Sequence, residues 1–325
     1  MGVHPMWDQF PEIKEELADV LKTIEKNIRI RDEQVKTIIR DLVTAGGKCL
    51  RPAYALLCSH IGPERDRNRA IAVAAAMECV HMATLIHDDV IDDAKTRHGR
   101  QTLHYQEGIQ FAIYAGDYMF SMALNLLADP SLELKDMDVA KKRLDKILAG
   151  ELEQLHSKYQ LPLSLKNYLS RISGKTAHLF AMSCFAGAVG SRAPKQLQEI
   201  AWNLGHDIGM AFQIMDDILD YKSDEKTLGK PVFHDIRQGI YTLPLYYAMQ
   251  THSIHLAPIL QKRDLSEEDL ERIWVILKES RGIEKAEQLA KRYTEKAIKQ
   301  IMKLPEGDYR NDLYNLTTLL LRRKM

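Results

Sequence analysis

The 325-residue sequence contains few of the residues that interrupt or crosslink a chain. It has 17 glycines and 11 prolines, fewer than an average globular protein, which favours long helices over a turn-rich β fold. Its cysteines show no C-x-x-C spacing and no dense framework, so we expect reduced thiols in a cytoplasmic protein. The four cysteines are Cys49, Cys58, Cys79 and Cys184.

The chain also lacks an excess of one charge and a long apolar run. Its 45 basic residues balance 45 acidic residues, so there is no global basic field that could hold nucleic acid. No uncharged apolar run reaches the roughly 18 residues that a transmembrane helix needs. The first residues have neither a basic nor an apolar signal-peptide region. We therefore expect no nucleic-acid partner, no membrane span and a cytoplasmic location.

Helical periodicity is the pattern that is present, and it recurs from end to end without a convincing strand pattern. Segments 70–86 and 179–189 are rich in alanine and other small residues, which is typical of helices buried on most sides. No flexible linker or low-complexity tract divides the chain. We predict one all-α domain over residues 1–325 rather than two domains. An N-terminal example of an apolar helical stripe is Ile13, Leu17, Val20, Leu21, Ile24 and Ile28.

The most informative segment is 87–93, which reads His-Asp-Asp-Val-Ile-Asp-Asp. On a helix Asp88 and Asp92 share a face, as do Asp89 and Asp93, and like charges at this spacing repel each other. The segment follows an apolar run and precedes basic residues, so a helix end is expected there, where the helix dipole disfavours carboxylates. Something cationic must neutralise them. Hard carboxylate oxygens with no soft ligand nearby suit Mg²⁺, which binds one or two carboxylates plus substrate phosphates.

A second copy of the pattern occurs at 213–220, Gln-Ile-Met-Asp-Asp-Ile-Leu-Asp. Asp216 and Asp220 again share a helical face. Two apolar helices that each carry D-D-x-x-D would suit facing walls of one cavity with several metal ions between them. A solvated acidic helix face is the alternative, and the duplication makes it the weaker one. The candidate metal ligands are Asp88, Asp89, Asp92, Asp216, Asp217 and Asp220.

Short basic clusters accompany the acidic motifs. Lys48 and Arg51 lie three residues apart at an expected helix start, where exposed amides favour an anion. Any one cluster is typical of ordinary surface charge. Together with two metal-type motifs they indicate two polyphosphate groups, one bridged by Mg²⁺ and one held directly by Lys and Arg. The other clusters contain Arg97 and Arg100, Lys175 with Thr176, and Lys230.

His81 precedes Asp88 by two helical turns. It is a candidate hydrogen-bond donor to a diphosphate, although a lone histidine there is more often a core or rim residue. The chain has no Walker loop, Rossmann glycine pattern, Ser-His-Asp set or zinc spacing, so kinase-type, dehydrogenase and hydrolase functions lack their key parts.

With these motifs the sequence resembles the trans-isoprenyl diphosphate synthases, or polyprenyl synthetases. It carries GGKxxRP, HDDVIDD, GKTA, FQIMDDILD and LGKP in the family's order, between roughly residues 40 and 300. The resemblance implies a large all-α bundle around a deep central cavity, usually dimeric. It also implies Mg²⁺-dependent head-to-tail addition of isopentenyl diphosphate to an allylic diphosphate of the farnesyl or geranyl type.

The resemblance assigns roles by motif position. Asp88 and Asp92 would ligate Mg²⁺ on the allylic diphosphate, joined from the opposite wall by Asp216. The departing diphosphate would take the final proton, so no protein nucleophile is needed. The residues implied to contact the allylic diphosphate are Arg97, Lys175, Thr176, Gln213 and Lys230. Those implied to hold isopentenyl diphosphate are Lys48, Arg51 and His81. The implied catalytic set is Asp88, Asp92, Arg97, Lys175, Asp216 and Lys230.

Two positions depart from the family pattern. His98 stands where the family usually has a second arginine facing isopentenyl diphosphate, and Ile240 stands where a basic residue often follows Gly239. Both changes remove permanent charge. If His98 faces isopentenyl diphosphate, its protonation should aid binding.

Segments 114–119 and 150–154 look most similar to the catalytic component of bacterial hexaprenyl or heptaprenyl diphosphate synthases. Those enzymes make menaquinone side chains and often pair with a small regulatory subunit, and their product would bring the enzyme transiently to membranes. A small residue at Ala83, five positions before Asp88, predicts an open passage for such a product. The alternatives are a homodimeric geranylgeranyl or farnesyl synthase and, from another class, a terpene cyclase-like or regulatory subunit. Two intact acidic motifs and a second diphosphate site disfavour that class.

Overall fold

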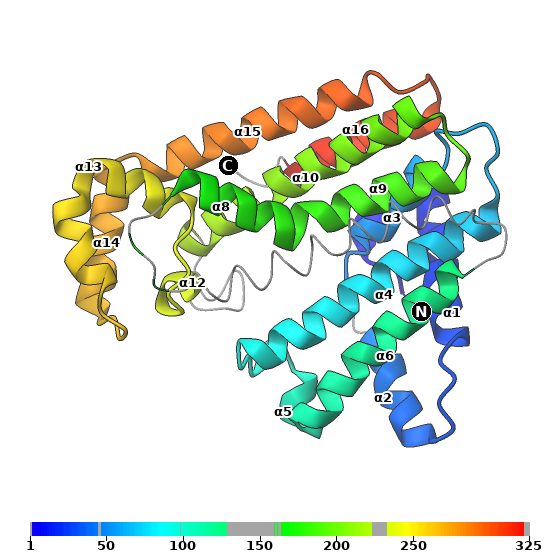
Figure 1. The fold of residues 1–325 in the computed structure, drawn as a ribbon, viewed down its shortest axis with the longest axis horizontal. Helices are drawn as coiled ribbons and strands as arrows, with labels where there is room; N and C mark the ends of the chain where they lie inside the picture. The colour runs from blue at the N-terminus through cyan, green and yellow to red at the C-terminus, as the bar shows by residue number, and fades with distance from the viewer. Residues whose placement is uncertain are drawn as a thin grey trace. The chain divides into compact units, whose positions relative to one another are not determined.

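The computed structural model describes residues 2–44, 47–97, 99–128, 159, 161, 164–222 and 233–321. Helices make up most of these residues (Figure 1), and the prediction of an all-α protein is confirmed. The first helices are η1 (Pro5–Gln9), α1 (Pro11–Lys26), α2 (Glu33–Thr44), α3 (Leu50–Cys58), α4 (Arg67–Ile91), α5 (Leu103–Glu107) and α6 (Ile109–Leu127). The later helices are α8 (Leu165–Ile172), η2 (Ser173–Ala177), α9 (His178–Gly190), α10 (Lys195–Lys222), α12 (His234–Arg237), α13 (Leu243–Leu260), α14 (Glu267–Glu279), α15 (Gly282–Ile301) and α16 (Asp308–Leu321).

The contacts of the chain group into two compact units. The first consists of Met1–Lys141, Leu179–Gly205 and Ile301–Tyr314. The second consists of Lys142–His178, His206–Gln300 and Asn315–Met325. The single domain over residues 1–325 stays a prediction.

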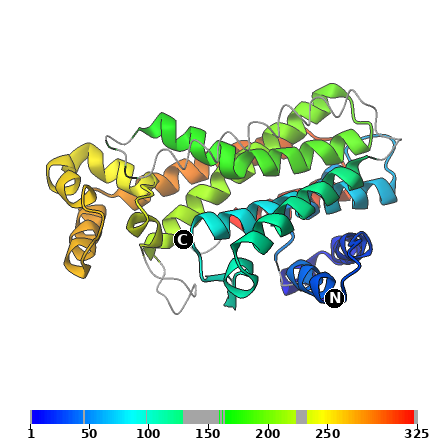
Figure 2. The same cartoon turned by 60° about the horizontal axis from the view of Figure 1, so that its bottom comes forward.

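In the first unit, α4 packs most extensively on α6, and the two helices run side by side in Figures 1 and 2. Helices α1 and α3 also pack on α4. The predicted apolar stripe of the N-terminal helix is buried throughout. Helix α1 begins at Pro11, in the first turn where proline is tolerated. Beyond α4, a short antiparallel hairpin joins β1 (Thr96–Arg97) to β2 (Arg100–Gln101), an element that the sequence pattern did not predict.

Helix α4 is the part of the described chain that is long and apolar enough to cross a membrane. Of its most apolar 18-residue window, 67% is buried inside the structure. This burial is typical of a core helix, and it agrees with the prediction for segment 70–86.

The second unit has its own core, in which side chains of α8, α10, α13, α14 and α15 pack together. Helix α14 begins with a capping box. The Ser266 hydroxyl accepts from the Asp269 backbone N–H, and the Asp269 carboxylate accepts from the Ser266 N–H, the reciprocal pattern of a serine with an acidic residue three positions later. Helix α10 carries the second acidic motif in its last two turns.

Candidate active site

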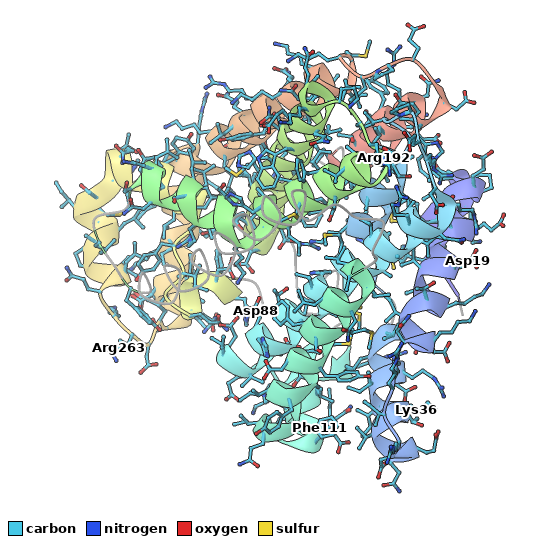
Figure 3. All side chains as sticks on the ribbon, turned by 45° about the vertical axis from the view of Figure 1, so that its right-hand side comes forward. Asp19, Lys36, Asp88, Phe111, Arg192 and Arg263 are labelled. Carbon is cyan, nitrogen blue, oxygen red and sulfur yellow. The ribbon has the colours of Figure 1, made fainter. Side chains whose placement is uncertain are left out.

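The first acidic motif lies where α4 ends. Asp88 and Asp89 occupy the last turn, and Asp92 caps the helix with its backbone N–H donating to the Asp88 carbonyl oxygen at 2.8 Å. Figure 3 labels Asp88 near this end of α4. The predicted helix end is therefore confirmed. Asp93 has a φ of 48° and lies outside the helix, so the expected shared face of Asp89 and Asp93 was wrong.

Asp89 forms an ion pair with Arg97. The arginine Nε and Nη2 atoms lie 2.8 and 2.7 Å from the Asp89 Oδ1 atom, and Asp89 is buried. Arg97 lies on β1, the first strand of the short hairpin that follows α4. One predicted metal ligand is thus neutralised by one predicted diphosphate contact. Asp88 and Asp92 are half-exposed, and Asp93, beyond the helix end, is exposed.

Helix α6 supports the motif through His87. The His87 Nε2 atom lies 3.4 Å from the Asp117 carboxylate and 3.3 Å from the Ile113 carbonyl oxygen. A Cβ at Gly116 would lie 2.3 Å from the same nitrogen. Glycine is therefore required for this close approach, which fixes the residue directly before Asp88.

The first basic cluster also belongs to the first unit. Cys49 adopts a left-handed conformation as the N-cap of α3, so Lys48 precedes the helix and Arg51 lies in its first turn. The Arg51 Nη1 atom donates to the His81 Nε2 atom at 2.9 Å. Because arginine only donates, His81 accepts here on Nε2. The structure therefore brings Arg51 and His81 together. Lys48 is held by its backbone, because the Trp7 indole N–H donates to the Lys48 carbonyl oxygen at 2.8 Å.

Glu78 is a charged residue of this cluster that the sequence analysis missed. It lies one turn before His81 on α4 and is only 6% exposed. Burial raises its pKa to about 7, an effect that the positive charge of Arg51 partly offsets. Burial also lowers the pKa of Arg51 to about 10. The signal that could have revealed Glu78 is its position as the one acidic residue inside the apolar segment 70–86.

The second acidic motif, on α10, divides into exposed and buried carboxylates. Asp216 is exposed, whereas Asp217 and Asp220 are 4% and 3% exposed. One Asp217 oxygen accepts from the Gln213 amide at 2.8 Å and the other accepts from the Tyr168 hydroxyl at 2.6 Å. Burial raises the pKa of Asp217 to about 6, although both hydrogen bonds oppose this shift. The sequence analysis missed Tyr168, because no local pattern reveals a hydrogen bond to a carboxylate 49 residues away in the chain.

The predicted residues Lys175 and Thr176 lie on η2, a single π-helical turn between α8 and α9. The Thr176 hydroxyl donates to the Gln213 Oε1 atom at 2.6 Å. A hydrogen-bonded chain therefore runs from Thr176 through Gln213 to Asp217 within the second unit. The remaining predicted residues, His98 and Lys230, lie outside the described residues.

The donor chemistry of both motifs fits a hard divalent cation. Among the described residues, no three His, Cys, Asp or Glu side chains form a group that could hold a metal by itself. Separate carboxylates of this kind suit an ion that binds one or two carboxylates and completes its coordination shell with water and substrate phosphates. Of the six predicted metal ligands, Asp88, Asp92 and Asp216 are the ones that are not buried.

The model of the polyprenyl synthetase family matches residues 32–277. The chain belongs to this family. A polyprenyl synthetase relative, heptaprenyl diphosphate synthase component 2 of Bacillus subtilis (strain 168), is 37% identical over 283 residues, which cover 87% of this chain and 81% of that protein. The protein is a prenyltransferase, a trans-polyprenyl diphosphate synthase.

Solved structures of polyprenyl synthetases share the isoprenoid synthase fold of the chain. Geranylgeranyl pyrophosphate synthase from Lactobacillus brevis ATCC 367 matches with a TM-score of 0.92 and 36% identity, covering 98% of this chain and 99% of that one. Polyprenyl synthase from Caulobacter crescentus CB15, complexed with calcium and isoprenyl diphosphate, matches with a TM-score of 0.89 and 30% identity, covering 97% of each chain. Divalent metal ions are thus used in this family, while its members differ in product length.

Proposed function

We propose that the protein elongates an allylic diphosphate with isopentenyl diphosphate to a hexaprenyl or heptaprenyl diphosphate for a menaquinone side chain. The reaction class follows from the family. The product proposal rests chiefly on Ala83, which is completely buried on the α4 helix that ends in the first acidic motif. The name of the Bacillus subtilis relative also supports a long product.

Mg²⁺ would be held by Asp88, Asp92 and Asp216. When bound, it supplies positive charge that stabilises a leaving diphosphate. The chain's own donors complete the allylic diphosphate site, and the observed Thr176–Gln213 hydrogen bond supports two of them. The remaining proposed donors of this site are Arg97, Lys175 and Lys230.

The proposed isopentenyl diphosphate site consists of Lys48, Arg51 and His81. The hydrogen bond between Arg51 and His81 and their position in one unit support this grouping. The double bond of isopentenyl diphosphate attacks the allylic carbon as its bond to diphosphate breaks, and the departing diphosphate takes the proton that is lost. Basic side chains on both diphosphates lower the barrier by stabilising charge that develops in the transition state.

The first test removes single carboxylates. Asp88→Ala and Asp216→Ala should each reduce turnover by orders of magnitude while far-UV circular dichroism stays that of the parent protein. Chelation with EDTA should abolish the parent activity. Near-normal turnover in either variant, with or without EDTA, would contradict the proposed Mg²⁺ sites.

The second test sizes the product. Purified protein is incubated with Mg²⁺, farnesyl diphosphate and labelled isopentenyl diphosphate, and the dephosphorylated products are separated by chain length. We expect hexaprenyl or heptaprenyl alcohols. Geranylgeranyl as the final product would contradict the proposed length and favour the geranylgeranyl synthase alternative.

A second subunit is the other part of the proposal, either a second copy of this cytoplasmic chain or a small regulatory subunit. Exposed apolar side chains on α6 support it, because Ile109, Tyr114 and Leu124 are 57%, 74% and 58% exposed. Tyr114→Glu should weaken the association, whereas Ile254→Glu, at an 84% exposed position on α13, should not. Light scattering on the chain alone and with its partner measures this. A fully active monomer would refute the need for a subunit.

A further inference from the structure

The π-helical turn η2 is an irregularity at a functional position. Turns of this kind are rare, appear mostly as single bulges in α-helices and are frequent at functional sites. This one spans Ser173–Ala177 and carries Lys175 and Thr176. Because a π turn has poorer packing than an α turn, it persists only where neighbouring groups hold it. Two histidines that the proposed function does not use, His178 and His206, make those contacts.

His178 closes the turn twice. Its backbone N–H donates to the Ser173 carbonyl oxygen, which is the i to i−5 hydrogen bond of a π turn. Its side-chain Nδ1 atom lies 2.5 Å from the same oxygen. A carbonyl only accepts, so Nδ1 carries a proton and donates. The side chain thereby adds a second hydrogen bond to the carbonyl group that defines the turn.

His206 fixes the turn from α10. Its Nε2 atom lies 2.9 Å from the Ser173 hydroxyl, and its Nδ1 side faces Asp207 at 4.0 Å. The rings of His206 and His178 meet edge to face, with centroids 5.9 Å apart. Ser173 therefore joins both histidines: its carbonyl group contacts His178, and its hydroxyl group contacts His206 and lies 3.4 Å from the His178 Nδ1 atom.

Two further residues on the same face of α10 contact the turn. A Cβ at Gly209 would lie 2.5 Å from the Ala177 Cα atom, so only glycine permits this separation. One turn later, Gln213 accepts from Thr176. His206, Gly209 and Gln213 are spaced by three and four residues, so a single helix face contacts the whole turn.

We propose that His178 and His206 are positioning residues that hold the π turn so that the Thr176 hydroxyl meets Gln213 and Lys175 faces the allylic diphosphate. The inference rests on the proposed function, in which Lys175 and Thr176 bind that diphosphate. If the turn relaxed to an α-helix, the helical register would change by one residue, a rotation of about 100°. Thr176 would then leave Gln213, and the chain of hydrogen bonds to Asp217 would be broken.

Paired amide substitutions test the proposal. The amide nitrogen of asparagine can occupy the place of histidine Nδ1, and that of glutamine can occupy the place of Nε2. His178→Asn should therefore preserve the turn and His178→Gln should lose it. His206 requires the opposite choice, because its Nε2 atom makes the contact: His206→Gln should preserve the turn and His206→Asn should lose it. His255→Asn, at an exposed position on α13, is the control.

Two measurements are needed. Hydrogen exchange of peptides covering η2 reports the turn directly, and we expect at least tenfold faster exchange in His178→Gln and His206→Asn than in their partners. Steady-state kinetics should show a KM for the allylic diphosphate raised about tenfold in the same two variants, with the KM for isopentenyl diphosphate changed less than twofold. Melting temperatures within each pair separate this effect from general destabilisation.

Equal exchange within both pairs would overturn the proposal, as would an equal rise in both KM values. If the parent protein makes no polyprenyl product, the proposed function fails, yet hydrogen exchange still tests the role of the histidines. If hydrogen exchange differs within each pair as expected but the KM for the allylic diphosphate does not, the histidines hold the turn without positioning a diphosphate site. The proposal is then also wrong.

Discussion

Substituting Glu78 by glutamine should change the pH dependence of stability. Burial raises the pKa of this carboxyl from 4.5 to about 7, although Arg51 opposes the shift. Since one pKa unit corresponds to about 1.4 kcal/mol, the charged form costs the folded state about 3 kcal/mol. Between pH 4.5 and 7 the folded chain keeps the proton that the unfolded chain has released. The free energy of unfolding therefore falls as pH rises through this window and levels off above it.

Glu78→Gln removes the titrating group while keeping its shape. At about pH 8 we expect the variant to be more stable than the parent by about 3 kcal/mol. Well below pH 4.5, where Glu78 is protonated in both states, the two proteins should be equally stable. Urea unfolding followed by far-UV circular dichroism across this range measures the difference.

Glu271→Gln, at an exposed position on α14, is the matched control and should leave the pH profile unchanged. A Glu78→Gln variant with the parent's pH profile, or one that is less stable at about pH 8, would refute the reasoning. The second result would mean that the charge is stabilised by contacts stronger than the attraction to Arg51.

Three further substitutions follow from particular contacts. Gly116→Ala should displace the His87 ring, since the added Cβ would lie 2.3 Å from its Nε2 atom; turnover should fall, and a crystal structure of the variant would show whether the ring moves. Tyr168→Phe leaves one oxygen of buried Asp217 without its donor and should lower stability by about 1–3 kcal/mol, measured by urea unfolding; a smaller loss would mean that water replaces the hydroxyl. Ala83→Phe should shorten the product, because Ala83 lies ~7.5 Å along the helix from the first acidic motif; an active variant with unchanged products would show that the chain does not pass Ala83.

Features that depend on near neighbours in the chain were predicted well. The buried stripe of α1 follows from helical periodicity. The end of α4 at the first acidic motif was predicted for the same reason. The hairpin that contains Arg97 was not predicted, because its two-residue strands have no readable periodicity.

The grouping of basic residues was predicted only in part. Arg51 and His81 were both named from their motifs, and they do form a hydrogen bond. Glu78 was missed, although it is the one acidic residue inside the apolar segment 70–86. Its burial beside Arg51 depends on how α3 packs against α4, which residue spacing does not encode.

The sequence by itself determined the helical class, the helix that carries each acidic motif and the choice of aspartate for a hard cation, because helical period and ligand chemistry are local properties. Only the tertiary structure decided which carboxylates form ion pairs or hydrogen bonds with other residues of the protein. Asp89 pairs with Arg97, and Asp217 is held by Tyr168 and Gln213, while Asp88 and Asp216 are left more accessible to solvent. Aspartates of a repeated motif therefore differ in burial and in their partners, which can be far away in sequence. Packing determines both.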